Sequence, residues 1–202
     1  MMTTQELRDF ETEIGDCFRQ KQIRAPIHLY DGNEEKMLEV FKNVTTNDWV
    51  FCSWRSHYQC LLKGVPKDRL KADIIAGRSI SLCYPEYKVF SSAIVTGVLP
   101  IANGMAFDLQ RRKQEGHVWC FVGDMTAESG CFSENYKYSV RYDLPITWVI
   151  EDNGKSVCTD TKKAWNLHTS TYGGDFSPIN KIIYYRYTTK YPHAGVGERI
   201  QF

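Results

Sequence analysis

The sequence predicts an α/β fold in which a parallel β-sheet is flanked by helices. Two short apolar runs, His117–Val122 and Ile146–Ile150, have the length and composition of buried strands. Residues of one helix face recur between them: Phe132, Tyr136, Ser139 and Val140. A strand-helix-strand unit of this kind is expected to place its two strands in parallel through a right-handed connection.

Helix-capping patterns predict two helices near the N-terminus. Thr3-x-x-Glu6 is a capping box, and the apolar residues that follow at helical spacing predict an amphipathic helix within residues 1–20. A second helix is expected after Asp31, because Asp31-x-x-Glu34 repeats the capping pattern ahead of another apolar face.

Two further elements are expected later in the chain. Pro100 fits the first turn of a helix that carries Ile101, Met105 and Leu109 and stops before Gly116. The late apolar run Ile182–Tyr187 predicts another strand.

The bulk properties favour a single domain over residues 1–202. The net charge of +1 comes from interspersed signs, which argues against a nucleic-acid partner. Seven cysteines without a Cys-x-x-Cys pair argue against a disulfide framework or a structural zinc site and favour a reducing cytoplasm. Neither an apolar leader nor an apolar run of membrane-spanning length is present, so no membrane partner is expected.

Polar residues follow both strands of the strand-helix-strand unit. Asp124 ends the first strand and Asn153 the second, and neighbouring strands lie about 5 Å apart, so the two side chains are expected side by side at the sheet edge where ligands bind. A carboxylate oxygen, an amide oxygen and a backbone carbonyl suit Mg²⁺, which completes its shell with phosphate oxygens and water. Taken alone, the spacing of these two residues favours ordinary turn and helix-cap residues over a metal site.

The segment GDMTAESGCFSENYKYSVRYDLPITWVIEDNGKS resembles the thiamine diphosphate motif, in which Gly-Asp-Gly is followed by an Asn that closes the next strand. The 29 positions between Asp124 and Asn153 match the alpha subunits of the decarboxylating component of 2-oxo acid dehydrogenase complexes. The resemblance implies the thiamine diphosphate-binding fold, with Mg²⁺ held by Asp124, Asn153 and the backbone carbonyl of Lys155. Further cofactor contacts are implied for Gly123, Met125 and Thr126.

The resemblance extends upstream in two segments that carry candidate catalytic residues. KQIRAPIHLYDGNEE resembles the family's Arg-x-x-x-His-Leu-x-x-Gly-Gln-Glu segment and places His28 on its active-site histidine. WRSHYQCLLKGV resembles the Tyr-Arg-x-His segment, which assigns Arg55 to the diphosphate and makes His57 a second candidate catalytic residue, with Trp54 in place of the Tyr. A guanidinium suits bidentate contact with phosphate oxygens.

AIVTGVLPIANGMA resembles a third family segment and implies that Ala93 and Val95 lie against the thiamine rings. The resemblance therefore covers residues 21–160, between an N-terminal helix (1–20) and a divergent, shortened part (161–202). Three of the candidate site residues could instead have purely structural roles. His28 could be a hydrogen-bonded histidine before a turn, His57 could start a helix, and Arg55 could form an ion pair at the surface. His117 and His168 match no catalytic position.

The chain departs from the family pattern at several positions. Met125 replaces the second Gly of Gly-Asp-Gly, and GRSISL lacks the histidine of the family's Gly-Ser-Met-His segment. Thr188 and Lys190 stand at the histidine positions of a loop that the family uses to hand the acyl group to a lipoyl carrier, with His193 nearby. A lipoyl-carrier partner is therefore an open expectation.

The glutamate that activates thiamine diphosphate belongs, in the family, to a separate pyrimidine-binding domain or beta subunit. The resemblance therefore implies a beta-type partner and an alpha2-beta2 assembly. Three functions follow: decarboxylation of a 2-oxo acid with acyl or aldehyde transfer, a thiamine-dependent carboligase or transketolase-like activity, or a non-catalytic scaffold subunit. A lipoyl-carrier gene nearby would favour the first function, and sugar-biosynthesis genes the second.

Overall fold

A six-stranded sheet forms the centre of the protein. The computed structural model describes residues 2–173 and 181–197. The strand order is β2-β3-β1-β4-β5-β8, and every neighbouring pair is parallel except β2 with β3. The strands of this sheet are β1 (Trp49–Cys52), β2 (Cys83–Tyr84), β3 (Val89–Ser91), β4 (Val118–Gly123), β5 (Ile146–Asp152) and β8 (Ile182–Arg186). A separate hairpin consists of β6 (Lys155–Ser156) and β7 (Thr159–Asp160).

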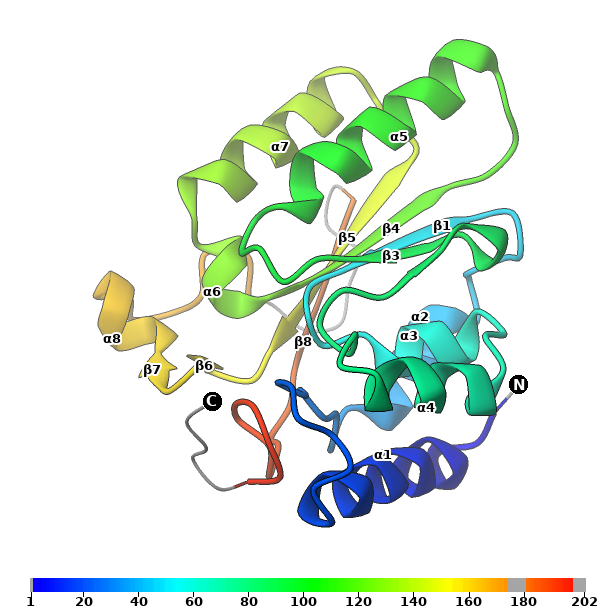
Figure 1. Ribbon diagram of the computed structural model, residues 1–202. Helices are drawn as coiled ribbons and strands as arrows, with labels where there is room; N and C mark the ends of the chain where they lie inside the picture. Colours follow the sequence, from blue (N-terminus) through cyan, green and yellow to red (C-terminus); the bar gives the residue numbers. More distant parts are fainter. Residues whose placement is uncertain (1, 174–180, 198–202) are drawn as a thin grey trace.

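Helices cover both faces of the sheet (Figure 1). One face carries α1 (Thr4–Arg19), α2 (Glu34–Phe41), α3 (His57–Leu62) and α4 (Lys67–Ile75). The other carries α5 (Val98–Arg112) and α7 (Gly130–Arg141). The short helices η1 (Pro85–Tyr87), α6 (Asp124–Ala127) and α8 (Thr161–Trp165) complete the described elements. None of the helices in the described ranges is long and apolar enough to cross a membrane.

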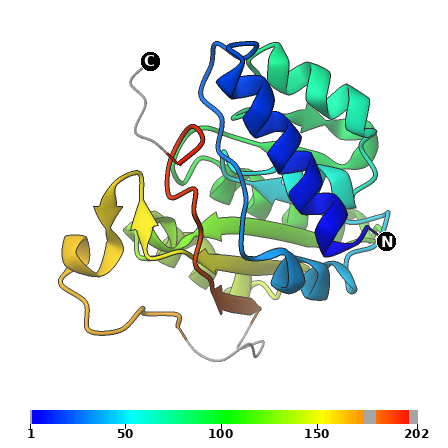
Figure 2. The ribbon, with the colours of Figure 1, turned by 90° about the horizontal axis from the view of Figure 1, so that it is seen from below.

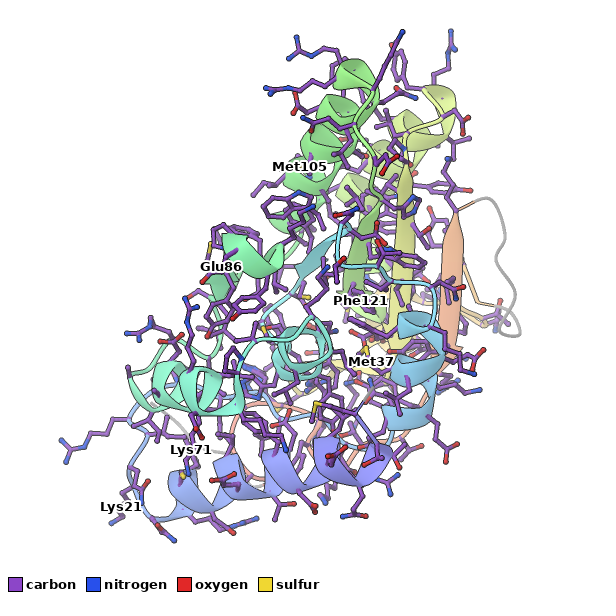
Figure 3. All side chains as sticks on the ribbon, turned by 90° about the vertical axis from the view of Figure 1, so that its right-hand side faces the viewer. Lys21, Met37, Lys71, Glu86, Met105 and Phe121 are labelled. Atoms are coloured by element: carbon purple, nitrogen blue, oxygen red, sulfur yellow. The ribbon has the colours of Figure 1, made fainter. Side chains whose placement is uncertain are left out.

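The side chains of β4 show why the strand is buried on both faces. Trp119 and Phe121 point into the core beneath α1–α4. Val118, Cys120 and Val122 point into the core beneath α5 and α7. Figure 3 shows Phe121 and Met37 inside the core beneath α1–α4, with Lys21 and Lys71 at the surface. Because both faces are apolar, the strand reads as a continuous apolar run.

The structure confirms the α/β architecture and most of the predicted elements. The Thr3 capping box starts α1 as expected. β4 and β5 are parallel neighbours joined through α7, and β8 lies at the predicted position. Of the C-terminal part that the sequence analysis separated, residues 174–180 and 198–202 lie outside the described residues.

The predicted cap of the second helix was wrong. Asn33, not Asp31, is the N-cap residue of α2, and it makes no side-chain cap. The Asp31 carboxylate instead pairs with Lys190, far along the chain. The third predicted helix is confirmed as α5, which has Pro100 in its first turn and ends before Gly116. Its face that packs on the sheet is formed by Val98, Ala102 and neighbouring residues, and Ile101 is exposed.

The segment after β8 returns to the N-terminal half of the protein. It lies beside the chain that follows α1, as Figures 1 and 2 both show. The Gly195 amide donates to the Ile27 carbonyl at 3.0 Å, and His28 forms a parallel bridge with Gly195. This contact closes one side of the sheet edge at which the predicted site residues lie.

The core packing predicts how the chain responds to loss of a large side chain. Phe121 is fully buried, and its ring stacks on that of Phe41 at a ring-centroid distance of 5.8 Å. We expect Phe121→Ala to lower the free energy of unfolding by about 3–5 kcal/mol, because it removes buried surface and leaves a cavity. Urea denaturation measures this. The control Phe107→Ala, at a residue 41% exposed, should cost about 1 kcal/mol or less, and equal losses would contradict the assigned core.

Candidate functional site

The carboxyl ends of four parallel strands border one cavity. Arg55 follows β1, Asp124 follows β4, Asn153 follows β5 and Tyr187 follows β8. The register of β4 and β5 sets Gly123 opposite Glu151, so the residues after these strands emerge side by side. The sequence-predicted residues that line the cavity are His28, Trp54, Arg55, Val95, Gly123, Asp124, Met125, Thr126, Asn153 and Lys155. Most of the residues that line this cavity were therefore predicted from the sequence.

Asp124 begins α6 directly after β4, and its carboxylate is almost fully buried. The hydroxyl of Thr161, the first residue of α8, donates to the carboxylate. Burial raises the pKa of Asp124 to about 6, the Thr161 hydrogen bond opposes that rise, and the nearby Asp152 carboxyl adds to it. A positive charge placed beside Asp124 would offset this cost of ionisation.

Asn153 lies in a tight turn between β5 and β6. Its side-chain oxygen accepts the Lys155 amide at 3.0 Å. The preceding Asp152 holds the same turn, because its carboxylate accepts the Gly154 amide at 2.7 Å and the Tyr184 hydroxyl. The turn therefore places the Asn153 amide and the Lys155 backbone at the cavity wall together with Asp124.

Arg55 is held by the C-terminal segment. Its Nη1 donates to the Tyr187 hydroxyl at 3.1 Å and its Nη2 to the Tyr191 carbonyl at 3.0 Å. Burial lowers the pKa of the guanidinium, but the phenol oxygens of Tyr187 and Tyr30 raise it above its ordinary value, so the group stays charged. Its buried Nε has no hydrogen-bond partner among the described residues. Arg55 is thus a fixed cation with an unused donor.

His28 contributes a neutral ring to the same wall. The ring centroid lies 5.5 Å from that of Trp54 and 5.4 Å from that of His193. Burial, the charge of Arg55 and the neighbouring His193 lower the pKa of His28 to about 3. Its buried Nδ1 has no hydrogen-bond partner within the described ranges. One ring nitrogen of this cavity residue is thus left unsatisfied by the described residues.

Two predicted site residues do not reach the cavity. His57 is fully buried in the core, where Nδ1 lies 3.0 Å from the Glu11 carboxylate and Nε2 lies 2.9 Å from the Ser79 hydroxyl. The ring joins α3 to α1 and to the loop after α4, a structural role that its position at a helix start allowed. Ala93 is exposed and absent from the cavity wall, although its neighbour Val95 lines it.

Sequence reasoning gave no role to Glu151, which also lines the cavity. Its carboxylate accepts the Tyr185 hydroxyl at 2.5 Å, the Tyr30 hydroxyl at 2.8 Å and the Asn33 amide at 3.1 Å. Burial raises the pKa of Glu151 to about 7, although the hydrogen bonds from Tyr185 and Tyr30 favour the ionised form. The only local signal was an acidic pair, Glu151 and Asp152, at the end of an apolar strand.

The cavity wall leaves room for a ligand beside the backbone. A Cβ added to Gly123 would meet no heavy atom within 4 Å, so this glycine faces open space. Met125, which stands where the resembling family has Gly, is turned toward α8, and the Trp165 indole donates to its sulfur at 3.0 Å. Within the described residues no group of three or more His, Cys, Asp or Glu side chains could hold a metal. A cation here would need the Asn153 amide and backbone oxygen as well.

Comparison with known proteins places the chain in a family. A model of the dehydrogenase E1 component matches residues 2–179. The chain belongs to this family. The match extends on both sides of residues 21–160, the part in which the sequence motifs carried the resemblance. It includes α1 and the region of α8.

Two relatives show how much of the family's length the chain covers. It is 27% identical over 165 residues to the alpha subunit of acetoin:2,6-dichlorophenolindophenol oxidoreductase from Bacillus subtilis, covering 76% of this chain and 49% of the relative. It is 29% identical over 163 residues to the alpha subunit of the pyruvate dehydrogenase E1 component from Porphyra purpurea, covering 72% and 47%. The chain thus spans about half the length of these relatives.

Among solved structures, one from Mycobacterium smegmatis, described as a thiamin diphosphate-dependent enzyme, has a TM-score of 0.44 and 16% identity. The likeness covers 65% of this chain and 22% of that chain.

The buried neutral His28 makes one acid-sensitive contribution to stability. Its pKa lies near 3 when folded and near 6.5 when unfolded, so the contribution of this ring falls as pH drops below about 6.5, whereas the raised pKa values of Asp124 and Glu151 act in the opposite direction. Between pH 7.5 and pH 5, this one group should cost about 2 kcal/mol of unfolding free energy. Urea denaturation at the two pH values should therefore show His28→Gln gaining about 2 kcal/mol of stability relative to wild type at pH 5. The exposed control His168→Gln should follow wild type, and the same pH dependence in all three proteins would contradict the burial of His28.

Proposed function

We propose that the chain is the alpha-type, diphosphate-binding subunit of a thiamine diphosphate-dependent enzyme. The enzyme decarboxylates a 2-oxo acid and transfers the resulting acyl or aldehyde unit. One observation carries the proposal: Asp124, Asn153, Arg55 and His28, which lie far apart in the sequence, line one cavity in a chain of the dehydrogenase E1 component family. The named relatives include alpha subunits of pyruvate and acetoin oxidoreductases.

The cavity offers oxygen ligands and a cation in the combination that a magnesium diphosphate needs. The Asp124 carboxylate, the Asn153 amide oxygen and the Lys155 carbonyl would hold Mg²⁺, and Arg55 would contact diphosphate oxygens. Gly123 and Thr126 border the same space, and Trp54 and Val95 supply apolar wall for the rings. When bound, thiamine diphosphate supplies the carbanion and electron-sink chemistry of decarboxylation.

The cavity residues of this chain would bind and orient the cofactor but would not activate it. The cavity contains the carboxyl of Glu151, but Tyr30, Tyr185 and Asn33 already hold it, which leaves it poorly placed to act on a cofactor ring. We therefore propose a beta-type partner that supplies the activating glutamate, in an alpha2-beta2 assembly. The exposed apolar side chains of the α5–α7 layer support a partner on this face: Ile101, Phe107, Tyr138, Val140 and Tyr142.

A carboligase or transketolase-like activity is the second candidate, and the C-terminal segment favours it. Lys190, at a histidine position of the family's loop, forms an ion pair with Asp31 at 3.1 Å and does not line the cavity. Thr188 is exposed and also lies outside the cavity wall. The residues used to pass an acyl group to a lipoyl carrier are thus replaced, and an aldehyde acceptor would not need them.

Calorimetry of the chain purified with its partner subunit tests the cofactor assignment. We expect thiamine diphosphate to bind with Mg²⁺ and at least about tenfold more weakly with excess chelator, because Asp124 would hold the metal that accompanies the diphosphate. Asp124→Asn should weaken binding by about tenfold or more, since it removes the charged ligand. Binding that is indifferent to Mg²⁺, or no binding at all, would leave the non-catalytic scaffold as the better description.

The substitution Gly123→Val distinguishes an effect on ligand binding from an effect on the stability of the fold. The backbone at Gly123 is extended, with φ −78° and ψ 162°, and an added side chain meets open space, so the variant should unfold like wild type. It should nevertheless lose thiamine diphosphate affinity by about tenfold or more, because the side chain occupies space beside the ligand. Gly130→Val, at a second open glycine outside the cavity, is the control. Unchanged affinity in Gly123→Val would contradict the assigned binding space.

A further inference from the structure

The segment after β8 brings a second histidine to the cavity. Pro192 and His193 line its wall, although the family resemblance assigned no role to either. The His193 ring meets the His28 ring at an interplanar angle of 62° and a centroid distance of 5.4 Å. The cavity therefore contains two imidazoles in contact, one from each end of the chain.

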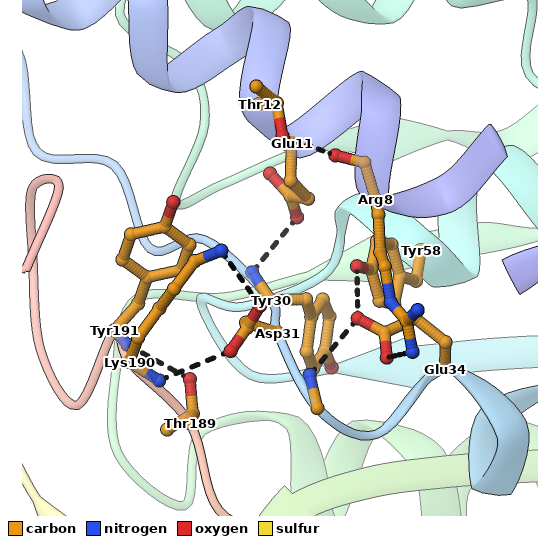
Figure 4. Close-up of polar contacts among 11 residues, drawn as sticks. Arg8, Glu11, Thr12, Tyr30, Asp31, Glu34, Tyr58, Thr189, Lys190 and Tyr191 are labelled. Carbon is orange, nitrogen blue, oxygen red and sulfur yellow. Dashed lines mark hydrogen bonds and ion pairs between the residues drawn. The ribbon is translucent and has the colours of Figure 1, made fainter. Parts of the chain in front are cut away.

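Several contacts fix the segment that carries His193. Figure 4 shows the ion pair between Lys190 and Asp31 and the hydrogen bond from the Tyr191 amide to the Thr189 hydroxyl. The Tyr191 carbonyl accepts Arg55 Nη2, and the Gly195 amide donates to the Ile27 carbonyl. His193 is thus held between two anchored positions rather than at a free end.

The nitrogen-bearing groups of the cavity are chemically distinct from its oxygen ligands. Asp124 and Asn153 present acceptors suited to a cation, whereas His28, His193 and the Arg55 guanidinium present ring and guanidinium nitrogens. Nδ1 of His28 is buried without a partner in the described part of the chain, which is costly unless a ligand satisfies it. Nitrogen donors beside a fixed positive charge favour an anionic ligand with oxygen acceptors.

We propose that His193 and His28 together bind the carboxylate and oxo oxygens of the 2-oxo acid. The inference rests on the proposed function, which supplies an oxo acid as substrate, and names the residues that recognise it. In the loop after β8, Thr188 and Lys190 stand at the positions where the resembling family has histidines. His193, further along the same loop, would supply an imidazole to the cavity in their place. Lys190 positions the segment through its pair with Asp31.

The experiment uses the chain with its partner subunit, loaded with thiamine diphosphate and Mg²⁺, and the probe is acetylphosphonate, which mimics the oxo acid end of pyruvate. His193→Phe keeps a ring for packing against His28 but removes the nitrogen atoms, whereas His193→Gln keeps an N–H donor without the ring. We expect calorimetry to show acetylphosphonate affinity falling about tenfold to 100-fold in His193→Phe and less than about threefold in His193→Gln. The KM for pyruvate should follow the same order, with smaller changes in kcat.

The controls separate the two proposals. His168→Phe, at an exposed histidine outside the cavity, should match wild type. Affinity for thiamine diphosphate should stay within about twofold in both His193 variants, because the metal and diphosphate ligands are untouched. A wild-type complex that fails to bind thiamine diphosphate would overturn the proposed function. A complex that binds thiamine diphosphate but not acetylphosphonate would overturn the recognition of the oxo acid by both histidines. An equal or greater loss in His193→Gln than in His193→Phe would overturn the role of His193 alone.

Discussion

The parallel pairing of β1, β4, β5 and β8 sets where every polar group of the cavity can lie. Each of these strands ends at the same edge of the sheet, and neighbouring strands are about 5 Å apart. The register in turn depends on the two apolar layers, because a slip of one residue would move Trp119 and Phe121 from one core to the other. The geometry of a ligand site at the edge is thus a consequence of hydrophobic packing beneath it. The polar residues need only follow their strands.

Burying polar groups at that edge costs free energy, and the chain offsets the cost unevenly. Glu151 receives hydrogen bonds from Tyr30, Tyr185 and Asn33, so its carboxylate is well satisfied without a ligand. By contrast, Nδ1 of His28 and Nε of Arg55 are buried without partners in the described residues. Unsatisfied groups are destabilising in the free protein and are satisfied when a ligand supplies the missing atoms. The Glu151 cluster is therefore complete without a ligand, whereas under the proposed function the free nitrogens of His28 and Arg55 are the groups that a ligand would satisfy.

The sequence predicted the elements with strong local signals and missed those fixed by distant contacts. The β4-α7-β5 unit follows from apolar periodicity, and the positions of Asp124 and Asn153 follow from the strand ends. The short strands β1 and β3 gave no usable pattern, because their stability comes from pairing within the sheet. Glu151 escaped notice since its partner Tyr30 lies 121 positions away. The place of His193 depends on the path of the chain after β8, which no local pattern encodes, and the same lack of tertiary information allowed His57 to be taken for a cavity residue.

The central claim is that Asp124 and Asn153 bind a metal only as part of a metal diphosphate. Electron paramagnetic resonance of Mn²⁺, used in place of Mg²⁺ and titrated into the chain with its partner subunit, measures this directly. With thiamine diphosphate present, we expect the free Mn²⁺ signal to decrease by the amount that corresponds to one bound ion per chain. Without thiamine diphosphate, we expect the signal to stay near the level measured in the absence of protein. In Asn153→Ala the signal should remain high in both cases. Equal Mn²⁺ binding with and without thiamine diphosphate, or unchanged binding in Asn153→Ala, would contradict the account.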